Sequence, residues 1–182
     1  MKKILISIRP EWVAKILHGV KTIEVRKTAP KCELPCEVYI YCTKGQPCLF
    51  APNDKNERYF IVNRPFATDF LNGKVVAKFT LNKAELIRYG THGIGYYPTE
   101  TPMNEMAEKS CLYFDEVDDY LKRKDGYGWH IDDLVIFDKP KGLEEFEFPN
   151  PSGIRYIGQR AIKGLPSKKR PPQSWCYVEV SE

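Results

Sequence analysis

A cluster of charged side chains follows the first predicted helix, in the segment HGVKTIEVRK at residues 18–27. Alternate residues of a strand share one face, so Thr22, Glu24 and Arg26 would lie together, and Lys21 at the preceding turn can reach the same face. Arg26 could hold a phosphate or a planar base with two parallel hydrogen bonds. Glu24 could accept from an exocyclic amine or act as a general base, while Lys21 could supply a positive charge or a nucleophile.

Two interpretations of this cluster remain open from spacing alone. It is typical of a ligand-binding strand, and it is also typical of an exposed strand whose ion pairs add little stability. The first interpretation predicts that the side chains of Lys21, Glu24 and Arg26 converge on one cleft.

The elements that would position this cluster are short. Residues 3–8 form an apolar run that predicts a buried strand. A helix is predicted from Pro10, whose missing N–H is tolerated in the first turn, to the stop signal at Gly19. Further strands are predicted at residues 22–26, 37–42, 74–82, 130–138 and 174–180, with a second helix at 114–122 and a turn at Gly126–Gly128.

The arrangement of these elements limits the fold class. Short strands and few helices, without regular alternation, predict a mixed α+β domain or a small β-barrel and argue against a parallel α/β sheet. The length of 182 residues suits one domain spanning residues 1–182, with loop insertions at about 44–72 and 90–110.

Composition narrows the class of protein further. The net charge is +4, which permits a nucleic-acid partner without requiring one, and aromatic residues make up 13% of the chain, enough for stacking surfaces as well as a core. No apolar run approaches the ~20 residues of a membrane span, and the short apolar run near the N-terminus does not match a signal peptide. We therefore expect a cytoplasmic protein without a membrane partner. The sequence leaves the oligomeric state open, with a monomer favoured for a small, mildly basic chain.

Six cysteines occur, and four of them lie between Cys32 and Cys48. Their C-x3-C-x5-C-x5-C spacing contains no C-x2-C pair, and structural zinc sites prefer such pairs on turns, so we expect free thiols and no metal. The sequence also lacks a phosphate-binding P-loop and a dinucleotide-binding glycine motif after a strand, so we expect no cofactor.

The pattern G-x-K-x-x-E-x-R, formed here by Gly19, Lys21, Glu24 and Arg26, resembles the signature of the ASCH family in the PUA-like superfamily. The resemblance extends to LISIRPEWVAKILHG at residues 5–19 and to GYGWHIDDLVIFDKP and RPPQSWCYVEV, which are similar to segments of ASCH-type proteins often found near phage genes. It implies an α+β fold, a small PUA-like open β-barrel of mixed, mostly antiparallel strands with flanking short helices, and a cleft beside the first helix.

The same resemblance implies RNA or modified nucleosides as ligands of that cleft. Some relatives are amidohydrolases acting on an acylated cytidine, and others are described as ribonucleases. In the amidohydrolase branch a lysine, a threonine and a downstream glutamate carry the reaction. Lys21 matches the lysine, Glu24 stands at the threonine position, and Glu85 is a candidate for the glutamate.

We therefore predict an RNA- or nucleotide-binding protein that uses a basic cleft beside the first helix. The alternatives are a hydrolase acting on nucleic acid or a nucleoside, with Lys21 and Glu24 as its catalytic residues, and a regulator that binds a protein partner. Trp129 could stack on a base or close the core, and His130 could move protons or simply pack. The predicted ligand-binding residues are Lys21, Glu24, Arg26, Arg9, Tyr41, Lys44, Trp129 and His130.

Overall fold

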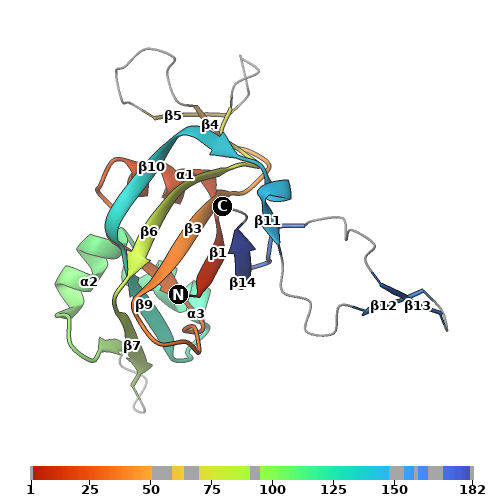
Figure 1. Cartoon of the computed structure of the whole chain (residues 1–182). Helices are drawn as coiled ribbons and strands as arrows, with labels where there is room; N and C mark the ends of the chain where they lie inside the picture. The colour runs from red at the N-terminus through yellow and green to blue at the C-terminus, as the bar shows by residue number, and fades with distance from the viewer. Residues whose placement is uncertain are drawn as a thin grey trace.

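The computed structural model describes residues 2–50, 59–63, 70–90, 95–147, 154–157, 160–163 and 170–180. Figure 1 shows a curved sheet at the centre of the molecule, with a second sheet and two helices below it. Among the described helices none is long and apolar enough to cross a membrane.

The larger sheet has six strands in the order β10-β6-β3-β1-β14-β11. β1 and β3 run parallel, and the other neighbours pair antiparallel. A mixed sheet of this kind places the N-terminal strand in the middle, where it is covered on both faces. The strands are β1 (Lys3–Ile8), β3 (Cys36–Cys42), β6 (Val75–Leu81), β10 (Asp132–Lys141), β11 (Phe146–Glu147) and β14 (Trp175–Val180).

The smaller sheet has four antiparallel strands in the order β2-β9-β7-β8. They are β2 (Ile23–Arg26), β7 (Ala84–Tyr89), β8 (Tyr96–Pro98) and β9 (Gly126–His130). Two hairpins complete the described strands: β4 (Cys48–Phe50) with β5 (Phe60–Val62), and β12 (Ile154–Ile157) with β13 (Arg160–Lys163). The helices are α1 (Pro10–Leu17), α2 (Met103–Ser110), α3 (Phe114–Leu121) and the short 3-10 turn η1 (Leu143–Glu145).

The main hydrophobic core forms between the larger sheet and α1. Ile4, Ile6 and Ile8 of β1 pack there with Val13 and Ile16 of the helix. Burying an aliphatic side chain of this size contributes about 1.5–3 kcal/mol. The packing of β1 against α1 therefore holds in place the end of α1, from which residues 21–26 continue.

A second core covers one face of β2. Ile23 and Val25 contact Met106 of α2 with Val117 and Leu121 of α3. Because strand residues alternate between faces, Glu24 and Arg26 are turned to the other side of the same strand. The packing of α2 and α3 against one face of β2 therefore leaves the opposite face for the charged side chains.

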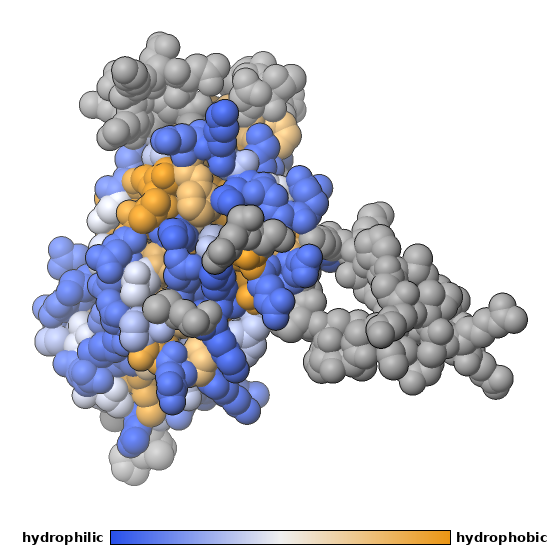
Figure 2. Space-filling view, in the orientation of Figure 1, coloured by the Kyte–Doolittle hydropathy of each residue, from blue (hydrophilic) through white to orange (hydrophobic). Residues whose placement is uncertain are grey.

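The α+β part of the predicted fold class is confirmed, since the structure has mixed and mostly antiparallel strands with short helices. In the described part of the chain the strands hydrogen-bond as separate sheets and do not close into a barrel. The face seen in Figure 2 is mostly hydrophilic, with small hydrophobic areas separated by polar residues.

Most of the predicted elements are confirmed within one or two residues, and the errors have physical causes. The glycines at 126 and 128 were expected in a turn but lie in β9. A Cβ at Gly126 would lie 2.7 Å from the Leu121 methyl carbons, and one at Gly128 would lie 3.0 Å from Met106 Cε. These glycines allow the helices to approach the strand closely. A glycine needed for close packing and a glycine needed for a turn look the same in the local sequence.

The predicted insertions remain predictions, because residues 51–58, 64–69 and 91–94 lie outside the described residues. The described part of 44–72 includes the strands β4 and β5. The segment at 90–110 was expected to be loop-like but contains β8 and α2.

Replacing Gly126 with Ala tests the close approach of α3 to β9. The added methyl group would collide with Leu121 Cδ1 and Cδ2, so we expect Gly126→Ala to lower the free energy of unfolding by about 1–3 kcal/mol, measured by urea denaturation. In a Leu121→Ala background the same change should cost less, because the two closest atoms are gone and only Arg26 O, at 3.2 Å, remains close. An equal cost in both backgrounds would contradict the packing argument.

Candidate functional site

The charged cluster on β2 is buried. The side chains of Glu24 and Arg26 are 9% and 8% exposed, and that of Lys21 is 1% exposed. The interpretation as an exposed, ion-paired strand is therefore wrong, and the three side chains do converge.

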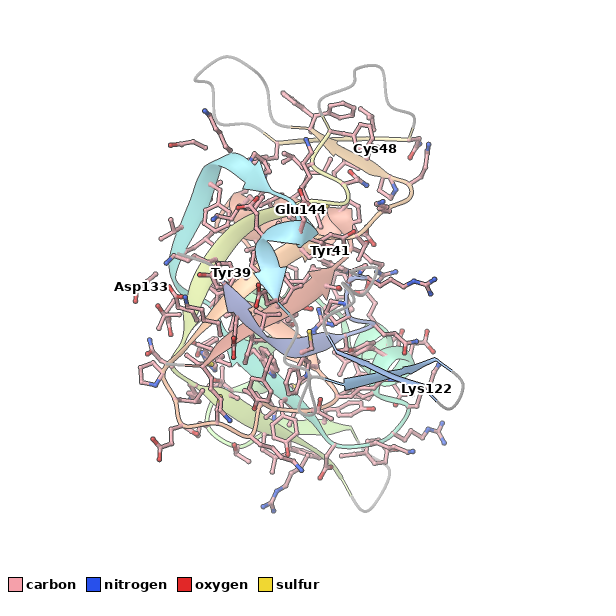
Figure 3. All side chains as sticks on the ribbon, turned by 45° about the vertical axis from the view of Figure 1, so that its right-hand side comes forward. Tyr39, Tyr41, Cys48, Lys122, Asp133 and Glu144 are labelled. Carbon is pink, nitrogen blue, oxygen red and sulfur yellow. The ribbon has the colours of Figure 1, made fainter. Side chains whose placement is uncertain are left out.

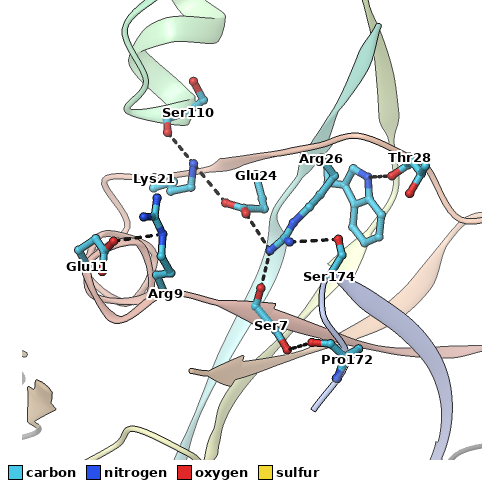
Figure 4. A network of polar contacts seen from close by, with 11 residues as sticks. Ser7, Arg9, Glu11, Lys21, Glu24, Arg26, Thr28, Ser110, Pro172 and Ser174 are labelled. Carbon is cyan, nitrogen blue, oxygen red and sulfur yellow. Dashed lines mark hydrogen bonds and ion pairs between the residues drawn. The ribbon is translucent and has the colours of Figure 1, made fainter. Parts of the chain in front are cut away.

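Lys21, Glu24 and Arg26 form one line of ion pairs, which we call the Lys21–Glu24–Arg26 row (Figure 4). Lys21 Nζ lies 3.2 Å from Glu24 Oε2, and Arg26 Nη2 lies 3.0 Å from Glu24 Oε1. Both carboxylate oxygens are thus engaged by a cation. The row carries two positive charges against one negative, so one net positive charge is held in a desolvated position.

Lys21 reaches the row because of the turn that follows α1. Gly19 has φ +71°, a left-handed conformation that a glycine adopts without strain. The backbone N–H groups of Val20 and Lys21 donate to Lys15 O, and Lys21 Nζ donates to Ser110 O at 2.5 Å. Ser110 is the last residue of α2, where carbonyl groups without an intrahelical partner and the helix dipole favour a cation.

Arg26 joins three separate segments of the chain (Figure 4). Its Nη2 donates to Ser7 O of β1 at 2.7 Å, and its Nη1 donates to Ser174 Oγ at 3.3 Å. Ser7 Oγ in turn donates to Pro172 O at 2.7 Å. The guanidinium group therefore positions the segment that leads into β14 as well as the carboxylate of Glu24.

The row forms part of the wall of a cleft of about 1710 Å³. The cleft receives side chains from α1, β2, β3, α3, the segment after β10 and the segment before β14. Seven basic side chains line it, against four acidic ones. The basic residues are Arg9, Lys21, Arg26, Lys27, Lys44, Lys74 and Arg170, and the acidic ones are Glu24, Glu116, Asp119 and Glu144.

Six of the eight predicted ligand-binding residues line this cleft: Lys21, Glu24, Arg26, Arg9, Tyr41 and Lys44. Arg9 is exposed and pairs with Glu11 at 3.2 Å, and Lys44 is exposed at the rim.

Tyr41 is buried on β3, and no described residue bonds its hydroxyl group. Burial raises the pKa of this hydroxyl, so it is a neutral donor and acceptor at neutral pH. Figure 3 labels Tyr41 together with Glu144, another residue of the cleft.

The other two predicted residues lie outside the cleft. Trp129 is completely buried in the main core, and its indole N–H donates to Thr28 O at 3.2 Å. His130 lies on β9 with its ring nitrogen Nε2 3.2 Å from Glu85 Oε2. Both were predicted to bind the ligand, with packing as the alternative, but β9 pairs between β2 and β7 and the cleft lining does not include them.

Glu85 is the centre of a separate polar cluster. It accepts hydrogen bonds from the backbone N–H groups of Glu100 and Thr101 at 2.6 Å and from Thr101 Oγ1 at 2.6 Å. Burial raises the pKa of its carboxyl group, but the bonds from Thr101, Glu100 and His130 outweigh burial and lower it to about 2. Glu85 therefore ties β7 to the segment before α2 and does not line the cleft.

Sequence reasoning missed two aromatic residues of the cleft, Trp12 and Tyr120. Both residues fall within the helices predicted from the sequence, where nothing in their spacing indicates contact with a ligand. The ring of Trp12 lies 5.3 Å from Lys21 Nζ, and the ring of Tyr120 lies 5.2 Å from Lys27 Nζ. Such contacts depend on the tertiary arrangement and leave no local pattern.

The cysteines show no arrangement suited to a metal. All six are free, and burial raises the pKa of the Cys36 and Cys42 thiols to about 12. Within the described residues no group of three His, Cys, Asp or Glu side chains could hold a metal ion.

Comparison with known proteins gives the fold. The crystal structure of ASCH from Zymomonas mobilis matches 98% of this chain and 88% of that chain, with 17% sequence identity and a TM-score of 0.57. The chain has the ASCH fold. Two further structures, of point mutants of the Z. mobilis protein, match 98% of this chain with 17% and 16% identity, 91% and 89% of their own chains, and TM-scores of 0.49 and 0.47. No family model and no curated protein matches the sequence.

Within this ASCH fold, Glu24 is expected to hold the cleft wall together. Glu24→Gln would leave two buried cations without their carboxylate, so we expect a loss of about 3–5 kcal/mol in the free energy of unfolding by urea denaturation. The matched control is Glu105→Gln, which breaks the half-exposed pair with Lys109 and should cost at most about 1 kcal/mol. Similar small losses in both variants would show that the row contributes no more than a surface pair.

Glu85 should make stability depend on pH. Its carboxyl pKa in the folded protein is about 2, below the ordinary value of 4.5, so its contribution is complete above pH 4.5 and is lost as the pH falls towards 2. We expect Glu85→Gln to lower the free energy of unfolding by about 2–3 kcal/mol at pH 7, with the difference from wild type shrinking below pH 4.5. A difference that stays constant between pH 7 and pH 2.5 would contradict this assignment.

Proposed function

We propose that this protein binds RNA or a nucleotide-containing ligand in the cleft, with phosphate groups on the basic side chains. The observation that carries the proposal is the buried Lys21–Glu24–Arg26 row, which places one net positive charge in a cleft whose other charged lining residues are five basic and three acidic. The ASCH fold supports it, because the sequence resemblance to that family implies the same ligand class.

The row is organised before any ligand arrives. Glu24 holds both cations, Ser110 O fixes Lys21, and Ser7 O fixes Arg26. A ligand therefore meets charges whose positions are already determined, so little side-chain entropy is lost on binding. Charges of this kind act more strongly in a partly desolvated cleft than in bulk water.

Two unpaired polar atoms support a polar ligand in the same place. In the described part of the chain, the buried side-chain atoms without a hydrogen-bond partner are Arg26 Nε and the Tyr41 hydroxyl oxygen. Both belong to residues of the cleft. An unpaired buried polar group costs about 1–3 kcal/mol, so a ligand or ordered water that reached these atoms would recover part of that cost.

The contacts favour binding over the hydrolytic alternative. Lys21 is held by Ser110 O and Glu24 and is thus suited to fix charge, whereas a nucleophile must be free to approach its target. His130 and Glu85, the other candidates for proton transfer, bond to each other outside the cleft. If the protein were instead a regulator that binds a protein partner, no salt-dependent RNA binding would be expected. The experiment below separates this alternative from our proposal.

Lys44→Ala tests the proposal without disturbing the buried row. We expect labelled single-stranded RNA, followed by fluorescence anisotropy between 50 and 200 mM salt, to bind wild type with a steep salt dependence. Loss of one phosphate contact in Lys44→Ala should weaken binding for all sequences and reduce the salt slope by about one.

The matched control is Lys139→Ala, an exposed lysine of β10 that does not line the cleft and should bind RNA as wild type does. Absence of binding by wild type at 50 mM salt, or equal losses in both variants, would overturn the proposal. Mass spectrometry of the same mixtures, and of wild type incubated with an acylated cytidine, would reveal hydrolysis if it occurs.

A further inference from the structure

An aromatic side chain stands at each end of the Lys21–Glu24–Arg26 row. Trp12 contacts the row at Lys21, whose Nζ lies 5.3 Å from the centre of the indole ring. Tyr120 contacts it at the other end, where its hydroxyl group interacts with the Arg26 guanidinium. Both aromatic residues line the cleft.

Trp12 lies in the first turn of α1 and is only partly buried against the main core. Lys15 Nζ lies 4.5 Å from its ring, and Lys15 is an exposed residue. An ammonium group over an exposed aromatic face contributes only about 0.5–1 kcal/mol, so a planar base with a larger contact area could displace it.

Tyr120 is held by α3 and is 36% exposed. Its ring lies 5.2 Å from Lys27 Nζ. Burial raises the pKa of its hydroxyl group, with Arg26 opposing that change, so the group is neutral and can donate to a base or sugar oxygen. The residue therefore offers an aromatic face and a hydrogen-bonding group at the same point.

The volume of the cleft indicates how large a ligand it can hold. Pockets for small molecules usually measure about 300–1,000 Å³, and this cleft measures about 1710 Å³. A single nucleoside would occupy only part of it. The remainder is lined by Lys44, Lys74 and Arg170, which suit the phosphates of a continuing chain.

We propose, on the basis of the function proposed above, that Trp12 and Tyr120 stack a nucleobase over the Lys21–Glu24–Arg26 row, so that the preferred ligand is a single strand rather than a duplex. Stacking requires an unpaired base whose faces are accessible, which a duplex does not offer. The phosphates of the same strand then lie along Lys44 and Lys74. Recognition in this arrangement depends on base and backbone together.

The experiment compares two probes of equal length and charge, a single-stranded oligonucleotide of about eight nucleotides and its abasic analogue. We expect wild type to prefer the base-carrying strand, and Tyr120→Ala to weaken binding of that strand about 5- to 150-fold while leaving the abasic analogue unchanged. Tyr120→Phe keeps the aromatic face and should retain most of the preference.

Tyr113→Ala is the matched control, because Tyr113 precedes the same helix, is 82% exposed and does not line the cleft. It should bind both probes as wild type does. Trp12 is followed by fluorescence, since quenching by the base-carrying strand should largely disappear in Trp12→Phe, leaving the buried Trp129 and the partly buried Trp175 as emitters.

The outcomes separate the two proposals. Equal binding of both probes by wild type, or unchanged binding of the base-carrying strand by Tyr120→Ala, would overturn the stacking proposal, while a loss in Lys44→Ala would still support the proposed function. Binding of neither probe by wild type would overturn both. Tighter binding of a duplex of the same length than of the single strand would also overturn the preference proposed here.

Discussion

The carboxylate of Glu24, held between two cations, is the interaction on which the rest of the site depends. A buried carboxylate is costly unless it is paired, and here each oxygen has its own cation. The pairing in turn allows Lys21 and Arg26 to be buried side by side. The result is a desolvated, net positive surface whose geometry is set by the fold and not by a ligand.

The row also connects parts of the protein that are distant in sequence. Lys21 bonds to the end of α2, and Arg26 bonds to β1 and to Ser174 before β14. The six-stranded sheet, the four-stranded sheet and α2 thereby meet at one set of charges. Substitutions in the row are therefore expected to change stability and ligand affinity together. Substitutions of exposed cleft residues such as Lys44 are expected to change ligand affinity alone.

The polar residues of β9 show how pairing determines exposure. His130 bonds to the buried Glu85, and Trp129 fills the core with its N–H satisfied by Thr28. Both belong to a strand flanked by β2 and β7. The partly exposed aromatic rings of the cleft instead belong to helices, Trp12 to α1 and Tyr120 to α3.

The sequence by itself determined the strand at residues 3–8, the helix beginning at Pro10 and the charged face of residues 21–26, since these follow from local periodicity, turn chemistry and the pattern that resembles the ASCH family. Only the tertiary structure decided that this face is buried, that Ser110 and Ser7 complete it, and that Trp12 and Tyr120 border it. The reason is physical. Spacing along a strand fixes which side chains share a face, whereas burial depends on segments 19, 89 and 148 residues away, which no local pattern specifies.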